Sequence, residues 1–296
     1  MRIFLTGATG FIGTTIVPEL VQAGHQVLGL TRSDAGAKAL QAAGADVHRG
    51  NLEDLESLRD GASKADAVIH TAFDHDFSNF AANCEKDHRA ILALGEALKG
   101  SKRTLLITSG TGLGDAGDGN PATEDVFNAG YPNPRKLSEL AGTELLNAGV
   151  NVSVMRLPQV HDTVKQGLIT FLVAIAREKG LVGYAGEGAN CYPAAHVSDV
   201  ARLYRLAIEK QQPGARYNAV AEEGVRVSQI AEALGRGLKL PVRSLSPDEA
   251  GDYFGWMIMF AAMDMRASGT KTKQLLDWHP SGPSLLTDLG NMNYNA

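Results

Sequence analysis

Hydrophobic and polar positions alternate along the first half of the chain in a strand–helix rhythm. Six short apolar runs have the length of buried strands: 2–5, 26–30, 46–48, 67–71, 104–108 and 152–156. Between them, apolar residues recur at helical spacing over five segments: 11–23, 35–43, 52–60, 77–98 and 135–148. Strands that alternate with helices predict a parallel sheet covered by helices on both faces, with right-handed crossovers.

The pattern loosens after residue 156. Helical spacing continues in four segments: 167–179, 198–209, 228–238 and 247–260. Short strand-like pieces such as 216–219 separate them. We therefore expect a doubly wound, Rossmann-type α/β fold, with a dinucleotide-binding domain over 1–160. A smaller, mostly helical substrate lobe should follow over 161–296, with segments near 190–220 returning to the main sheet. No Pro/Gly/Ser linker divides the two parts, so they should pack as one unit.

A glycine-rich turn lies between the first strand and the first helix. Gly7 permits a tight turn, Gly10 lets a diphosphate approach the backbone, and Gly13 lets the helix pack closely on the strand. The free N–H groups and the positive dipole end of the helix favour phosphate binding. The loop therefore predicts a dinucleotide site that includes Gly7. The other loop residues expected to contact the dinucleotide are Thr9, Gly10, Phe11, Ile12 and Gly13.

The end of the second strand indicates which dinucleotide is bound. An NAD site usually places Asp or Glu here, bonded to the ribose hydroxyls. This chain has Thr31 at that place, followed by Arg32. Without a carboxylate nothing repels a 2′-phosphate, and a guanidinium can bind it bidentately. The pattern favours NADP over NAD; the alternative is that Arg32 is a solvated surface residue.

Composition excludes several other classes of protein. The net charge is −5 and no basic run is visible, so we expect no nucleic-acid partner. No apolar stretch approaches the roughly 20 residues that cross a bilayer, and the N-terminus does not resemble a signal peptide. Two distant cysteines, Cys84 and Cys191, suit a reducing compartment, so the expected location is the cytoplasm. No spacing predicts a metal site.

Five segments follow the glycine loop at the places where strands end: 50–52 (GNL), 68–72 (VIHTA), 108–110 (TSG), 156–158 (RLP) and 196–201 (HVSDVA). Together with TGATGFIG at 6–13 they resemble the extended and atypical short-chain dehydrogenase/reductases, a superfamily that includes NAD(P)-dependent epimerases and dehydratases. The resemblance runs from residue 1 to about 205 and is weaker afterwards.

The resemblance implies further cofactor contacts. Asn51 and Leu52 should lie beside the adenine, where an amide oxygen could serve the adenine amino group in place of the usual Asp. Thr71 and Ala72 should line the channel of the nicotinamide ribose. Two residues should back the nicotinamide ring: Leu157 and Pro158.

The resemblance also implies a catalytic set of Ser or Thr followed by Tyr-x-x-x-Lys. Ser109 matches the serine, which would hold the substrate oxygen, and Tyr131 matches the tyrosine, which would serve as acid or base. Arg135 replaces the lysine; it stays protonated, so it can hold a ribose but cannot relay a proton. Pro132 and Pro134 disfavour helix at the residues before them, so Tyr131 should precede the helix. A loop tyrosine without a catalytic role is the alternative.

Substrate contacts are expected from Phe73 and His75 after the fourth strand and from His161 after the sixth. His75 could replace the acid or belong to a solvated loop. The leading hypothesis is an NADPH-dependent reductase or dehydrogenase acting on a carbonyl or alcohol group of a small organic molecule. The alternatives are a nucleotide-sugar epimerase or dehydratase and a non-catalytic NADP-binding sensor. A homodimer is common in such proteins, but no segment is diagnostic of an interface.

Overall fold

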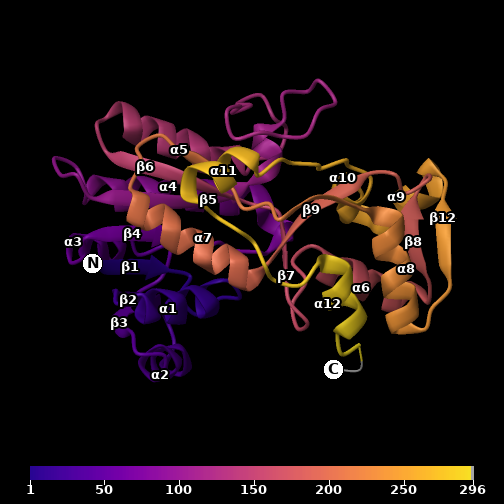
Figure 1. Ribbon diagram of the computed structural model, residues 1–296, viewed down its shortest axis with the longest axis horizontal. Helices are drawn as coiled ribbons and strands as arrows, with labels where there is room; N and C mark the ends of the chain where they lie inside the picture. The colour runs from indigo at the N-terminus through magenta and orange to yellow at the C-terminus, as the bar shows by residue number, and fades with distance from the viewer. Residues whose placement is uncertain (295–296) are drawn as a thin grey trace.

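Parallel strands form the main sheet of the computed structural model, which describes residues 1–294 (Figure 1). The doubly wound α/β class expected from the sequence is confirmed, because the strands follow the order β10-β6-β5-β4-β1-β2-β3 and every neighbouring pair is parallel. The strand bounds are β1 (Arg2–Thr6), β2 (Gln26–Thr31), β3 (Asp46–Arg49), β4 (Ala67–His70), β5 (Thr104–Gly110), β6 (Asn151–Leu157) and β10 (Arg216–Asn218).

Helices cover both faces of this sheet because alternate strand residues point to opposite sides. Ile3 and Leu5 of β1 pack with one group of helices and Phe4 with the other. The first group is α1 (Gly13–Gln22), α2 (Asp34–Ala42), α7 (Val197–Lys210) and α11 (Thr270–Leu276). The second group is α3 (Leu55–Ser63), α4 (Phe80–Glu96, preceded by η1, Phe77–Asn79) and α5 (Lys136–Asn147).

The smaller lobe lies beyond the carboxyl edge of the sheet, at the right of Figure 1. Its helices pack around two short sheets, one of order β11-β9-β7 and one of order β12-β8. The strands are β7 (Gln159–His161), β8 (Val182–Ala185), β9 (Cys191–His196), β11 (Glu222–Arg226) and β12 (Val242–Leu245). The helices are α6 (Ile169–Lys179), α8 (Val227–Leu238), α9 (Pro247–Phe254), η3 (Gly255–Met257), α10 (Ile258–Ala261) and α12 (Leu285–Asn291).

The structure differs from the sequence expectation in three places. Of the region near 190–220, only β10 joins the main sheet, beside β6, whereas β9 pairs with β7 and β11. The helix expected over 247–260 is interrupted at Gly255, whose φ of +53° ends α9. The helix expected over 135–148 begins one residue later, at Lys136, after a turn in which the Lys136 amide donates to the Asn133 carbonyl at 3.2 Å.

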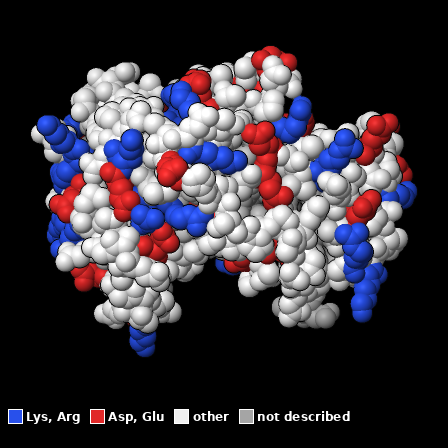
Figure 2. All heavy atoms as spheres, viewed as in Figure 1, with Lys and Arg blue, Asp and Glu red and all other residues white. Residues whose placement is uncertain are grey.

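The surface carries mixed charge. Figure 2 shows acidic and basic side chains interspersed over both halves of one face. Among the described residues, no helix has both the length and the apolar character that a membrane crossing needs. The glycine loop and the ends of β4, β5 and β6 meet at the carboxyl edge of the sheet, which is where ligands bind in open α/β folds.

Candidate active site

The glycine loop has the geometry of a diphosphate cradle. Gly7 has a φ of +72°, and a Cβ there would lie 2.6 Å from Thr71 Oγ1 and 2.7 Å from the amide nitrogen of Ala72. A Cβ on Gly13 would overlap the Gly7 carbonyl and lie 2.8 Å from the Cα of Ala8. Within residues 1–294, the backbone N–H groups of Phe11, Ile12 and Gly13 donate to no acceptor. Three free donors at a helix start fit an anionic diphosphate.

Arg32 is exposed and forms no hydrogen bond or ion pair with the rest of the described chain. The preceding Thr31 is buried, and its hydroxyl accepts a 3.4 Å hydrogen bond from the amide of Ser33. Ser33 in turn caps α2 by accepting from the Gly36 amide at 3.0 Å. The strand therefore ends with a free guanidinium, and no carboxylate stands at the position that contacts the ribose in NAD sites.

Asn51 differs from its expected role. Its side-chain oxygen accepts hydrogen bonds from the amides of Glu53 at 2.7 Å and Asp54 at 3.2 Å. That oxygen therefore closes a turn and does not serve an adenine amino group as expected. The Nδ2 group of Asn51 makes no hydrogen bond to another described residue. Leu52 packs against the core beside α3.

Thr71 and Ala72 are tied to the end of β1. Thr71 Oγ1 donates to the carbonyl of Thr6 at 2.8 Å, and the Ala72 amide donates to Thr6 Oγ1 at 3.3 Å. Both residues thus stand against Gly7, at the place where the sequence resemblance puts a cofactor channel.

A cavity of about 150 Å³ opens between the ends of β5 and β6 and the smaller lobe. Leu157 and Pro158 form part of its wall, as do Tyr131 and Arg135. The remaining lining residues are Gly110, Thr111, Gly112, Leu113, Asn133, Gln159, Leu168, Tyr192, Pro193, Phe260, Met263 and Met265. The cavity is the place where residues of the main sheet, the loop before α5 and the smaller lobe meet.

Tyr131 lies in the loop before α5, as the two prolines that follow it predict. Its hydroxyl donates to the sulfur of Met263 at 3.1 Å. Burial, and to a lesser degree the Asp115 carboxylate, raise the pKa of Tyr131. The phenol is therefore protonated at neutral pH and able to donate its proton. A thioether is a weak acceptor, so a carbonyl oxygen can replace it.

Arg135 is held by a buried polar chain. Its Nη1 donates to Asp87 Oδ2 at 2.5 Å and its Nη2 to the Thr108 carbonyl at 3.0 Å. Asp87 also accepts from Ser138 Oγ at 2.6 Å and lies 3.0 Å from Nε2 of His70. The other ring nitrogen of His70 is 2.7 Å from the hydroxyl of Thr6, the residue that precedes Gly7. This series of hydrogen-bonded side chains thus links the phosphate loop to Arg135.

Ser109 does not reach the cavity. It lies inside β5, faces α5 and donates to Glu139 Oε1 at 2.7 Å. Glu139 also accepts from buried Arg156 at 2.7 and 2.8 Å, and Arg156 donates to the carbonyls of Thr123 and Val126. Ser109 therefore belongs to a cluster that holds the loop before α5 in place. The role expected of its hydroxyl as the group that holds the substrate oxygen is wrong for this geometry.

Thr111 also lines the cavity and carries a hydroxyl, and sequence reasoning missed it. Strand β5 ends at Gly110, and the 3₁₀ turn that follows (η2, Thr111–Gly114) carries Thr111 into the wall. Its hydroxyl makes no hydrogen bond to another of the described residues. The signal in the sequence was the run Gly110-Thr111-Gly112, which favours a turn over continued strand.

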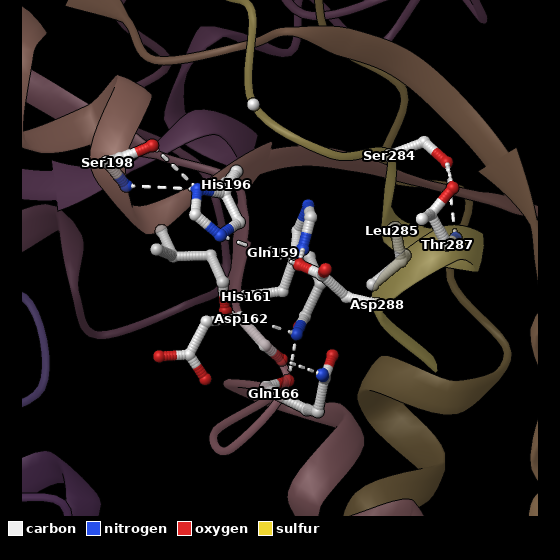
Figure 3. Close-up of polar contacts among 12 residues, drawn as sticks. Gln159, His161, Asp162, Gln166, His196, Ser198, Ser284, Leu285, Thr287 and Asp288 are labelled. Atoms are coloured by element: carbon white, nitrogen blue, oxygen red, sulfur yellow. Dashed lines mark hydrogen bonds and ion pairs between the residues drawn. The ribbon is translucent and has the colours of Figure 1, made fainter. Parts of the chain in front are cut away.

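His161 is also absent from the cavity wall. It is fully buried, and Figure 3 shows its ring beside Asp288 of α12, with Nδ1 2.7 Å from the carboxylate. Burial lowers the pKa of His161, against the opposing effect of Asp288. The expected substrate contact is therefore wrong, because the β7 strand turns the side chain toward the C-terminal helix. The side-chain oxygen of Gln159 accepts a hydrogen bond from the amide of Leu168 at 3.0 Å.

Phe73 and His75 stand beside Arg135. The guanidinium carbon lies 4.1 Å from the centre of the Phe73 ring, and the rings of Phe73 and His75 pack edge to face at 5.2 Å. His75 is exposed as a residue, yet desolvation of its ring by neighbouring atoms and then the Arg135 charge lower the pKa of His75. Neither residue is among those that line the cavity itself. The described chain holds no cluster of three or more metal-binding side chains.

Comparisons with known proteins agree with this architecture. The family model described as NAD dependent epimerase/dehydratase family matches residues 3–220. An uncharacterized protein of Schizosaccharomyces pombe is 43% identical over 99% of this chain and 100% of its own length. The 4-hydroxy-2-methyl-3-oxo-4-farnesyl-3,4-dihydroquinoline-1-oxide ketoreductase of Stigmatella aurantiaca is 26% identical, covering 73% of this chain and 67% of its own.

Among solved structures, the dTDP-glucose 4,6-dehydratase of Streptomyces venezuelae with NAD and TYD bound has a TM-score of 0.77. It covers 99% of this chain and 96% of its own at 18% identity, so it bears on the fold alone. The family match and the fold confirm the resemblance seen in the sequence. The chain belongs to the NAD-dependent epimerase/dehydratase family of the extended short-chain dehydrogenase/reductases, and an NAD(P) dinucleotide is its implied cofactor.

Proposed function

We propose that this chain is an NADPH-dependent reductase that acts on the carbonyl group of a small organic molecule. The observation that carries the proposal is the cavity wall, where the hydroxyls of Thr111 and Tyr131 stand with Leu157 and Pro158 at the carboxyl edge of the sheet. Two hydroxyl donors beside the expected nicotinamide position suit a carbonyl oxygen that gains negative charge during reduction.

The preference for NADPH rests on Arg32. Its guanidinium is exposed and unpaired among the described residues, and it follows Thr31 where NAD sites carry an acid. The Arg32 cation would attract a 2′-phosphate, and no carboxylate at the end of β2 would repel it. The diphosphate itself would be held by the free amides of Phe11, Ile12 and Gly13.

The side chains of this site have separate roles in carbonyl reduction. A bound nicotinamide would supply the hydride that reduces the carbonyl carbon. Thr111 donates a hydrogen bond to the carbonyl oxygen, and Tyr131 transfers its phenolic proton to that oxygen. Arg135 holds the ribose hydroxyls, with its charge balanced by Asp87. Because an arginine cannot relay a proton, Tyr131 regains its proton from water, which reaches its partly buried hydroxyl.

One relative supports reduction over epimerisation. The Stigmatella protein is described as a ketoreductase, and its 26% identity extends over 73% of this chain. The dehydratase whose fold is shared contains NAD, and this chain lacks the acidic residue that favours NAD at the end of β2. The carbonyl substrate would then gain one hydride and one proton and leave the site as the alcohol.

The proposal is tested by titrating the purified protein with NADPH and NADH in a calorimeter and then offering a panel of ketones and aldehydes, with loss of reduced nicotinamide as the readout. We expect NADPH to bind about tenfold tighter than NADH or better, and we expect turnover of some carbonyl compounds. Tyr131→Phe should lower kcat about 100-fold with unchanged NADPH affinity.

Other outcomes identify the alternatives. NADPH binding without turnover of any carbonyl, and with no effect of Tyr131→Phe, would make the chain a dinucleotide-binding protein without catalysis. NAD that copurifies with the protein and is not displaced by NADPH would favour an epimerase or dehydratase. Either result would contradict the proposal.

A further inference from the structure

The walls of the cavity are mostly apolar away from Thr111 and Tyr131. Phe260, Met263, Met265 and Leu168 line it from the smaller lobe, and Leu113 lines it from the main-sheet side. Methionine side chains adapt their shape to varied hydrocarbon groups, because three torsions turn freely and the sulfur is polarizable. A cavity of about 150 Å³ is comparable to one that holds a single benzene ring in other proteins.

The cavity offers no free charge to an ionised ligand. Among the described lining residues, Arg135 is the one charged side chain. Its Nη1 is paired with Asp87 at 2.5 Å, its Nη2 bonds the Thr108 carbonyl, and its flat face lies on Phe73. A carboxylate or phosphate inside the cavity would lose its water and gain no unpaired cation, which is costly.

Most polar groups on the wall already have partners. Gln159 bonds the amide of Leu168 and the carbonyl of Gln166, and the Tyr192 hydroxyl donates to the Phe260 carbonyl at 3.0 Å. Three residues remain available: Thr111 has no partner among the described residues, Tyr131 bonds a thioether, and Asn133 uses its side-chain oxygen for the Arg135 amide and keeps its Nδ2 donors. The cavity thus presents one polar end and an apolar remainder.

A cluster of aromatic rings extends the apolar wall outward from Phe260. Phe77, just before α4, stacks on Trp256 at 5.0 Å, and Phe171 packs on both rings edge to face. Phe260 lies 6.4 Å from the Phe77 and Trp256 ring centres. Trp256 is 48% exposed. Hydrocarbon that protrudes from the cavity would therefore meet aromatic surface from both lobes.

We infer that the substrate is an uncharged, mainly apolar ketone or aldehyde, with its carbonyl oxygen at Thr111 and Tyr131 and its hydrocarbon part against Met263 and Met265. The inference rests on the proposed reductase function and excludes nucleotide sugars and other compounds that would place a phosphate or carboxylate in the cavity. Met265 lines this wall, whereas the sulfur that accepts the Tyr131 hydroxyl belongs to Met263, so Met265 can be replaced without removing that hydrogen bond.

The test uses the full chain with NADPH and three compounds. Two are a matched pair, a phenyl ketone and the same ketone with a carboxylate on the ring, and the third is a nucleotide sugar. We expect kcat/KM for the neutral ketone to exceed that for the carboxylate about 100-fold, and no turnover of the nucleotide sugar. A carboxylate or nucleotide sugar that is used as well as the neutral ketone would overturn the inference.

Two lysine variants show where the preference arises. Met265→Lys should improve the carboxylate-to-neutral ratio of kcat/KM about tenfold or more, because it places an unpaired cation in the wall. The matched control is Met259→Lys, since Met259 is 45% exposed and lies outside the cavity wall. Met265→Leu should keep the original ratio and shows whether the position tolerates change. Equal ratios for the two lysine variants, both folded by circular dichroism, would contradict the inference.

Failure of this inference can be told apart from failure of the proposed function. If no carbonyl compound is turned over, binding of the two alcohol products to the NADP-loaded protein is measured by calorimetry. Tighter binding of the neutral alcohol than of its carboxylate partner would uphold the apolar site while refuting reduction. Turnover limited to carboxylate-bearing ketones would uphold reduction while refuting the apolar site.

Discussion

The substitution Asp87→Asn removes one negative charge from the centre of the polar chain and leaves the side chain's shape unchanged. Asp87 is 1% exposed and is the shared acceptor for Arg135 and Ser138. Burial alone would raise the pKa of Asp87, but Arg135 and then His70 lower it to about 2. The ionised carboxylate is therefore stabilised by the folded protein, and Asp87→Asn leaves Arg135 without its counter-charge.

The size of the effect follows from these values. A pKa that falls from 3.8 to about 2 corresponds to about 2 kcal/mol in favour of the folded state. Removing one partner of a buried pair costs about 3–5 kcal/mol. Because the Arg135 side chain remains 15% exposed, we expect the lower end, about 3 kcal/mol of unfolding free energy. For a chain of 296 residues that is a fall of roughly 5 °C in Tm.

Urea unfolding followed by circular dichroism measures this loss, and its pH dependence adds a second test. Because the folded pKa of Asp87 lies below the unfolded value, its stabilisation is complete above about pH 4 and is lost as the pH falls toward 2. Asp87→Asn should remove that part of the acid sensitivity. The matched control is Glu85→Gln, an exposed carboxylate on the same helix. The reasoning is refuted if both variants unfold at the same urea concentration.

The remaining predictions concern the cofactor site and the hydroxyls. Arg32→Ala should weaken NADPH binding about tenfold to 100-fold and leave NADH binding unchanged, by calorimetry. Thr111→Val should lower kcat/KM about tenfold or more with little change in Tm. Ser109→Ala should lower Tm and leave kcat unchanged, because Ser109 bonds the buried Glu139 carboxylate outside the cavity. Gly13→Ala should abolish dinucleotide binding, because its Cβ would overlap the Gly7 carbonyl; retained affinity would contradict the cradle geometry.

Periodicity and loop chemistry were enough to predict the main sheet and the phosphate loop. A strand that must be buried on both faces is continuously apolar, and a glycine needed at a positive φ, such as Gly7, stands out in any sequence. The position of Tyr131 before its helix also followed, because prolines restrict the residues that precede them. These features depend on local chemistry, which a sequence displays directly.

The orientation of single side chains could not be predicted in the same way. Ser109 and Thr111 are two residues apart, and the choice between them depends on where β5 ends and η2 begins. The direction of His161 depends on α12, more than a hundred residues later. One signal was present but unused, because Asp87 lies on the apolar stripe of α4 with Cys84 and Ile91. A carboxylate on such a stripe indicates a buried cationic partner.

Transfer of deuterium from C4-labelled NADPH to a neutral phenyl ketone tests the central claim most directly. Mass spectrometry of the product should show one deuterium on the carbinol carbon, with turnover about 100-fold lower in Tyr131→Phe at equal NADPH occupancy. An alcohol product without label, or a protein saturated with NADPH that forms no alcohol from any ketone, would contradict the account.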